Sequence, residues 1–181
     1  MANYAVLELL QVAAQNIDSY NVVFESSAVV ENGQLFSQGA LSATAGETEV
    51  YATATPATAT LSNLFMAYSP EDVILAAANG NQYKVGDYDP RNFANVVGLT
   101  FTGYRIALGD KIKLTAEGFT GTKGASDVFA VATDGQDKLV WGTAAGNGVS
   151  YALDKVSYVS IPSSTFGSQR VVSYQLRCVN V

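Results

Sequence analysis

The chain has 181 residues, one cysteine, no histidine and a formal net charge of −6. This length fits a single domain with its own core, and the lack of histidine excludes Ser-His-Asp catalysis, Cys-His catalysis and His-ligated zinc. Ten scattered basic residues in an acidic chain argue against nucleic acid as a partner, because binding phosphates requires clustered Lys and Arg.

The surface is expected to carry few charges. Only 14% of the residues are charged, against roughly 25% in an average globular protein. A weakly charged surface is poorly suited to a free monomer, so we expect part of it to be covered in an assembly.

The N-terminal residues 5–16 (AVLELLQVAAQN) fit either a short helix or a strand followed by a loop. We expect residues 1–18 to form an extended or short-helical arm on a single β-rich domain at 19–181, with sub-lobes 19–98 and 99–181 as a further division. The start lacks the pattern of a signal peptide, and no stretch reaches the roughly 20 apolar residues of a membrane span. Synthesis in a cytoplasm and no membrane partner are therefore expected.

The first half of the domain reads mainly as strands. Asn32-Gly33 predicts a tight hairpin that pairs strands near 20–30 and 34–41, because both residues tolerate positive φ. The Ala/Thr-rich stretch at 40–62 favours extended backbone, with its strand at 50–55, and a short apolar strand follows at 63–69. Residues 71–83 fit either a short helical turn or a buried strand.

The second half alternates more regularly. A strand at 98–108, a Gly109-Asp110 turn and a strand at 111–119 are expected, with Ile112 and Leu114 on one face and Lys111 and Lys113 on the other. A hairpin follows around Asp134-Gly135, joining 126–133 to 138–143, and the last strands lie at 149–162 and 170–181. Turn signals every 8 to 15 residues predict an antiparallel sandwich or barrel built from hairpins.

Catalytic and metal-binding groups are sparse. Four loose carboxylate pairs leave a hydrolase as a remote alternative, and they are Asp87/Asp89, Glu47/Glu49, Glu71/Asp72 and Asp134/Asp137. The last pair resembles part of a calcium loop, but a hairpin turn explains it with fewer assumptions. We expect no enzyme activity, no cofactor and no metal, and we expect Cys178 to be a small apolar residue of the terminal strand.

The aromatic residues are assigned mostly to the core or to cross-strand pairs. Phe101, Phe129, Tyr151 and Tyr158 alternate within expected strands, which is typical of such positions. Trp141, next to Gly142, is the candidate for exposure.

The most polar stretch, GDYDPRNFANVVG at 86–98, is interpreted first as a loop. Its Tyr88, Arg91 and Phe93 are residue types favoured at protein interfaces. These three side chains are therefore the candidate contact with a partner.

Six stretches carry a family resemblance, and they are 1–6 (MANYAV), 32–35 (NGQL), 103–115 (GYRIALGDKIKLT), 127–135 (DVFAVATDG), 138–141 (KLVW) and the last strand at 170–179. Together they resemble the small capsid decoration (auxiliary head) proteins of tailed bacteriophages. The segments 42–60 and 87–91 depart from that outline.

The resemblance implies a structural protein on the exterior of the virion. Its partners would be the major capsid protein and further copies of itself, with a trimer as one option. A glycan-binding or cell-surface-binding head-fibre or spike module is the alternative function.

Overall fold

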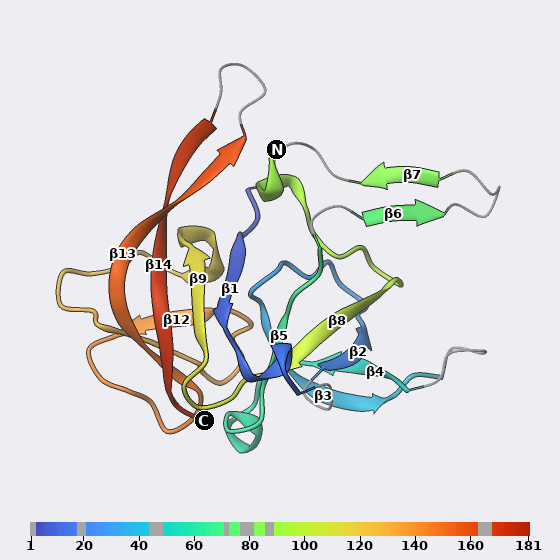
Figure 1. Ribbon diagram of the computed structural model, residues 1–181. Helices are drawn as coiled ribbons and strands as arrows, with labels where there is room; N and C mark the ends of the chain where they lie inside the picture. Colours follow the sequence, from blue (N-terminus) through green and yellow to red (C-terminus); the bar gives the residue numbers. More distant parts are fainter. Residues whose placement is uncertain are drawn as a thin grey trace.

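The computed structural model describes residues 3–17, 21–43, 49–70, 73–76, 82–85, 89–162 and 168–181. These residues form β-strands joined by loops and short 3-10 turns, which confirms the predicted mainly-β class. Figure 1 shows two main bodies, a closed five-stranded barrel and a seven-stranded sheet, with a separate two-stranded hairpin. Within the described part of the chain, no helix is long and apolar enough to cross a membrane.

The barrel closes in the order β2-β4-β3-β5-β8. Its strands are β2 (Asn21–Glu25), β3 (Leu35–Leu41), β4 (Val50–Ala54), β5 (Phe65–Ala67) and β8 (Thr100–Arg105). The predicted antiparallel pairing holds for four of its five pairs, since β2 and β4 pair in parallel.

Phenylalanine rings fill the barrel. Phe24 is fully buried, and its ring centroid lies 4.6 Å from that of Phe36 and 5.1 Å from that of Phe65. Gly103 on β8 makes room for them, because a Cβ there would lie 2.6 Å from Phe36 Cζ. The alternation of inward-facing and outward-facing residues along these strands thus places one phenylalanine ring from each of several strands inside a small barrel.

The seven-stranded sheet runs in the order β1-β9-β14-β13-β11-β12-β10. Its strands are β1 (Leu7–Gln11), β9 (Lys111–Thr115), β10 (Phe119–Thr120), β11 (Phe129–Val131), β12 (Leu139–Gly142), β13 (Ser150–Pro162) and β14 (Ser168–Asn180). The predicted hairpin of β11 and β12 is confirmed, and Ile112 and Leu114 are fully buried as expected. All the pairs are antiparallel except β10 with β12, so the predicted antiparallel arrangement holds for this sheet apart from one parallel pair.

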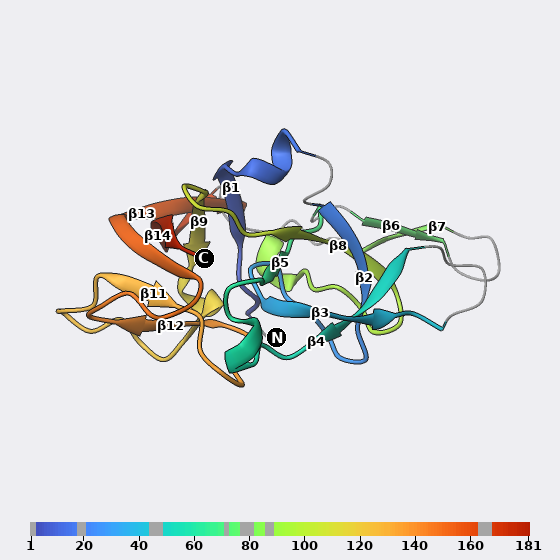
Figure 2. The same cartoon turned by 90° about the horizontal axis from the view of Figure 1, so that it is seen from below.

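The barrel and the sheet lie side by side in Figure 2 and share one core. Leu35, Met66 and Tyr104 from the barrel belong to the same buried cluster as Ile112 and Leu176 from the sheet. Backbone hydrogen bonds cross the boundary as well, at 2.6 Å from Leu35 N to Asp137 O and at 2.8 Å from Val149 N to Leu61 O.

The N-terminal segment takes the extended alternative. Residues 7–11 are β1, which pairs with β9 and is followed by a 3-10 turn, η1 (Ala13–Gln15). Val6, Leu7 and Val12 are at most 3% exposed. This part of the predicted arm is therefore integrated into the sheet and its core.

The predicted hairpin between residues 20–30 and 34–41 is wrong. A turn does form, with Gly33 at φ +88° and Gln34 N bonded to Glu31 O at 3.2 Å, but β2 and β3 do not pair with each other. The chain leaves the turn towards β5 instead, because Gly33 N bonds to Ala67 O at 2.8 Å.

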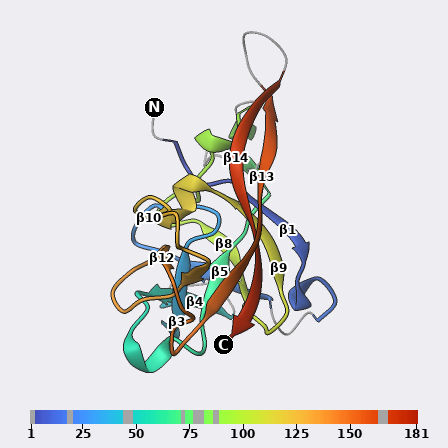
Figure 3. The same cartoon turned by 90° about the vertical axis from the view of Figure 1, so that its left-hand side faces the viewer.

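Two hairpins extend beyond these bodies. β6 (Val73–Ala76) and β7 (Gln82–Val85) pair beside the barrel, which settles residues 73–76 as strand and not helix. β13 and β14, 13 residues each, form a long ribbon that rises above the rest of the molecule in Figure 3.

Candidate binding surfaces

The described part of the polar stretch, residues 89–98, begins with a capped turn. Asp89 precedes the 3-10 turn η4 (Pro90–Asn92), and its Oδ1 accepts a hydrogen bond from Arg91 N at 3.0 Å. The Arg91 guanidinium also contacts this carboxylate, with Nε to Oδ1 at 3.0 Å and an N–H to Oδ2 at 2.6 Å. This bidentate pair lowers the pKa of Asp89 and raises that of Arg91.

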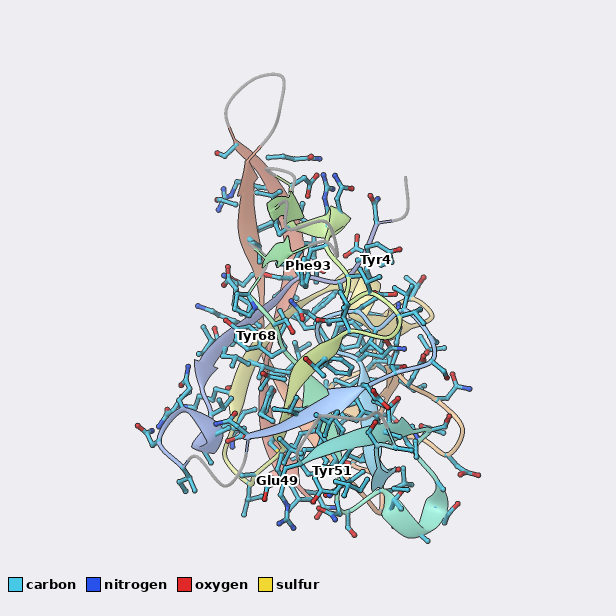
Figure 4. The ribbon with its side chains drawn as sticks, turned by 90° about the vertical axis from the view of Figure 1, so that its right-hand side faces the viewer. Tyr4, Glu49, Tyr51, Tyr68 and Phe93 are labelled. Carbon is cyan, nitrogen blue, oxygen red and sulfur yellow. The ribbon has the colours of Figure 1, made fainter. Side chains whose placement is uncertain are left out.

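Arg91 connects this turn to two other elements. It donates to Gln169 Oε1 on β14 at 3.3 Å, and its carbonyl oxygen accepts from Tyr4 N at 2.8 Å. Phe93 is 6% exposed, and Figure 4 shows it level with Tyr4, just below the projecting ribbon. The side chains of Arg91 and Phe93 thus already have partners within the chain, while Asp87 and Tyr88 lie outside the described residues.

An apolar groove of about 210 Å³ lies beside Phe93. It is lined by residues of the 69–70 and 93–102 segments, among them Pro70, Phe93, Val96, Leu99 and Phe101. Two of the lining side chains are exposed, Val96 at 47% and Leu99 at 42%, and Val97, which follows Val96 in the chain, is 49% exposed. The sequence signal for this surface is the apolar run Val96-Val97 beside Gly98, which takes φ +75°.

A second exposed apolar surface lies on the ribbon. Val156, Tyr158 and Val172 are 53%, 48% and 40% exposed, and Tyr158 pairs directly with Val172 across the two strands. Arg170 lies over the Tyr158 ring, 4.8 Å from its centroid, as in a cation–π contact. Of the two roles expected of Tyr158, core residue or cross-strand partner, the core role is wrong because the ribbon extends past the body.

Trp141, Phe101 and Tyr151 are less exposed than Tyr158. Trp141 is half-buried, stacked on Phe119 with ring centroids 4.4 Å apart, so the predicted exposure is only partial. Phe101 and Tyr151 are buried, as expected of core residues.

The carboxylates of the Asp134-Gly-Gln-Asp137 turn accept hydrogen bonds from distant segments of the chain. Asp134 Oδ1 accepts from Thr58 N at 2.9 Å, Asp137 accepts from the Gln34 side chain, and Gly135 takes φ +71°. Of the other pairs, Asp87, Glu47, Glu71 and Asp72 lie outside the described residues. Among the residues that the structure describes, no group of three or more acidic or cysteine side chains is arranged to hold a metal ion.

Cys178 is 2% exposed, and its thiol donates to Asn180 O at an Sγ–O distance of 3.3 Å. Burial raises the pKa of this thiol to about 12. We therefore expect a disulfide reagent at about pH 8 to modify the folded chain at least about 100-fold more slowly than the urea-unfolded chain, because only the thiolate reacts. The absorbance of the thiolate that the reagent releases gives the rate of modification. Similar rates for the folded and the urea-unfolded chain would contradict the burial of Cys178.

The barrel and sheet that share one core, and the ribbon that leaves the sheet, are the features that any relative should reproduce. Neither a protein-family model, nor a curated protein, nor a solved structure matches this chain.

Proposed function

We propose that this protein is a structural virion component that binds the outer surface of an assembled phage capsid. The observation that carries the proposal is the exposure of large apolar side chains in two continuous places, around the groove and along the ribbon. Monomeric proteins rarely leave such patches uncovered unless they form an interface. The resemblance described above supplies the kind of partner, which is a major capsid protein.

The low charge of the chain supports the same proposal. With 14% charged residues and a net charge of −6, much of the surface is neutral and suited to close packing against another protein. Self-association, including a trimer on the capsid, is part of the proposal for the same reason.

The test is binding of the purified chain to isolated capsids that lack it. We expect saturable binding at a fixed ratio of copies to capsid protein, measured by co-sedimentation and by imaging of the decorated particles. Absence of binding to capsids, together with specific binding on a glycan array, would replace the proposal with the glycan-binding alternative.

A further inference from the structure

The projecting part of the ribbon has an open strand edge. β11 pairs with β13 only at Ser150–Ala152, so from Asp154 to Pro162 β14 is the only strand that pairs with β13 among the strands described. An open edge presents backbone N–H and C=O groups that an added strand can bond. In β-augmentation these bonds supply affinity, and side chains at alternate positions supply specificity.

The two faces of the ribbon differ. On one face Val159 and Ile161 are 5% and 0% exposed and pack in a cluster with Val6, so this chain covers that face itself. The opposite face bears Val156 and Tyr158, both about half exposed and both on the open strand. The open edge and the uncovered apolar face are thus adjacent, as a strand-binding surface requires.

The charge of the ribbon is opposite to that of the chain. From residue 155 onward its two strands contain Lys155, Arg170 and Arg177 and no carboxylate, although the whole chain has a net charge of −6. Asp154, just before this part, pairs with Arg177 at 3.3 Å. Arg170 lies on the apolar face, over the Tyr158 ring, and Lys155 directly precedes Val156 on the open strand. Such cations favour an acidic partner.

We propose that the β13 edge, with Val156, Tyr158 and Arg170, receives an extended segment of the capsid's outer surface. The segment adds to β13 as a strand, covers Val156 and Tyr158 with apolar side chains, and places a carboxylate against Arg170. This inference rests on the proposed function and names the surface that performs it. Tyr and Arg are residue types that commonly dominate binding energy at interfaces.

The experiment measures binding of the full chain to isolated, undecorated capsids for the wild type, Tyr158→Ser and Arg170→Glu. We expect each variant to bind at least about tenfold more weakly, as loss of an interface anchor would cause. Val128→Ser is the matched control, since Val128 is 48% exposed, as Tyr158 is. It lies outside both the groove lining and the two ribbon strands, and the affinity of this variant should stay within about twofold of wild type.

Added salt and a folding check complete the design. Wild-type affinity should fall as salt rises, and this dependence should be weaker in Arg170→Glu. All variants should melt within a few degrees of wild type, since the altered side chains are exposed. If Tyr158→Ser does not fold, Val172→Thr on the same face of the ribbon replaces it.

The outcomes separate the two proposals. If the wild type binds capsids and the ribbon variants bind equally well, the ribbon inference is overturned and the proposed function stands. If the wild type binds no capsid, the proposed function fails and the inference fails with it. If capsid binding is unchanged but the ribbon variants sediment as smaller species, the ribbon contacts a second copy of this chain, which also overturns the inference.

Discussion

Replacing Phe24 with alanine is expected to lower the free energy of unfolding by about 3–5 kcal/mol. Phe24 is fully buried in the barrel, where its ring lies 4.6 Å from Phe36, 5.1 Å from Phe65 and 6.3 Å from Phe101. Removal of the ring leaves a cavity that these neighbours cannot fill, because each is fixed on a different strand of a closed barrel.

The matched control is Val23→Ala, the next residue along the same strand. Val23 is 42% exposed and faces away from the barrel interior, so its loss should cost less than about 1 kcal/mol. Urea unfolding followed by fluorescence gives both free energies. Equal losses for the two variants would show that the phenylalanine cluster does not stabilise the barrel.

The sequence predicted those parts of the fold that depend on neighbouring residues. The alternation of Ile112 and Leu114 with Lys111 and Lys113 correctly separated the two faces of β9, since the first two are fully buried and the lysines are partly exposed. The turn at Asp134-Gly135 correctly joined an antiparallel pair, because only a short loop separates its strands.

Strand partners that are distant in the chain could not be predicted in this way. Asn32-Gly33 has the local signature of a hairpin and does turn the chain, but a Cβ at Gly33 would lie 2.6 Å from Leu114 Cδ1 on the other body. The glycine is thus required by a contact between residues 81 positions apart, and β2 pairs instead with β4 and β8. Local turn chemistry contains no information on that choice.

The candidate contact residues show the same limit. Arg91 and Phe93 have the composition of an interface, but Asp89, Gln169 and the groove wall engage them within the chain. Tyr158 was assigned by periodicity, which identifies the face of a strand but not whether another layer covers it. β13 continues past the sheet because it is much longer than its neighbour β11, and the alternation within β13 does not contain that information.

Replacing Asp110 with alanine is expected to cost about 3 kcal/mol of stability at neutral pH. Asp110 is 3% exposed, and its carboxylate accepts hydrogen bonds from Ala13 N and Ala107 N, at 2.8 Å each. The bond to Ala13 joins η1, which follows β1, to the turn before β9. Alanine leaves both buried N–H groups without this acceptor, and Asp110→Asn should lose nearly as much, because an amide offers one acceptor oxygen and not two.

The pH dependence of the same variant gives an independent check. Burial raises the pKa of Asp110 above the 3.8 of an exposed carboxyl, so the folded chain binds this proton more tightly than the unfolded chain. Stability linked to this group is therefore gained as pH falls through the folded pKa and lost as pH rises. The difference between wild type and Asp110→Ala should widen between neutral pH and about pH 4.

Asp154→Ala is the control for this pair of measurements. Asp154 forms a partly exposed ion pair with Arg177, and its loss should cost less than about 1 kcal/mol. A loss from Asp110→Ala as small as that from Asp154→Ala would mean that water replaces the carboxylate at both N–H groups. In that case Asp110 would not hold the N-terminal strand against the sheet, and the integration of β1 would depend on its apolar contacts and its pairing with β9 alone.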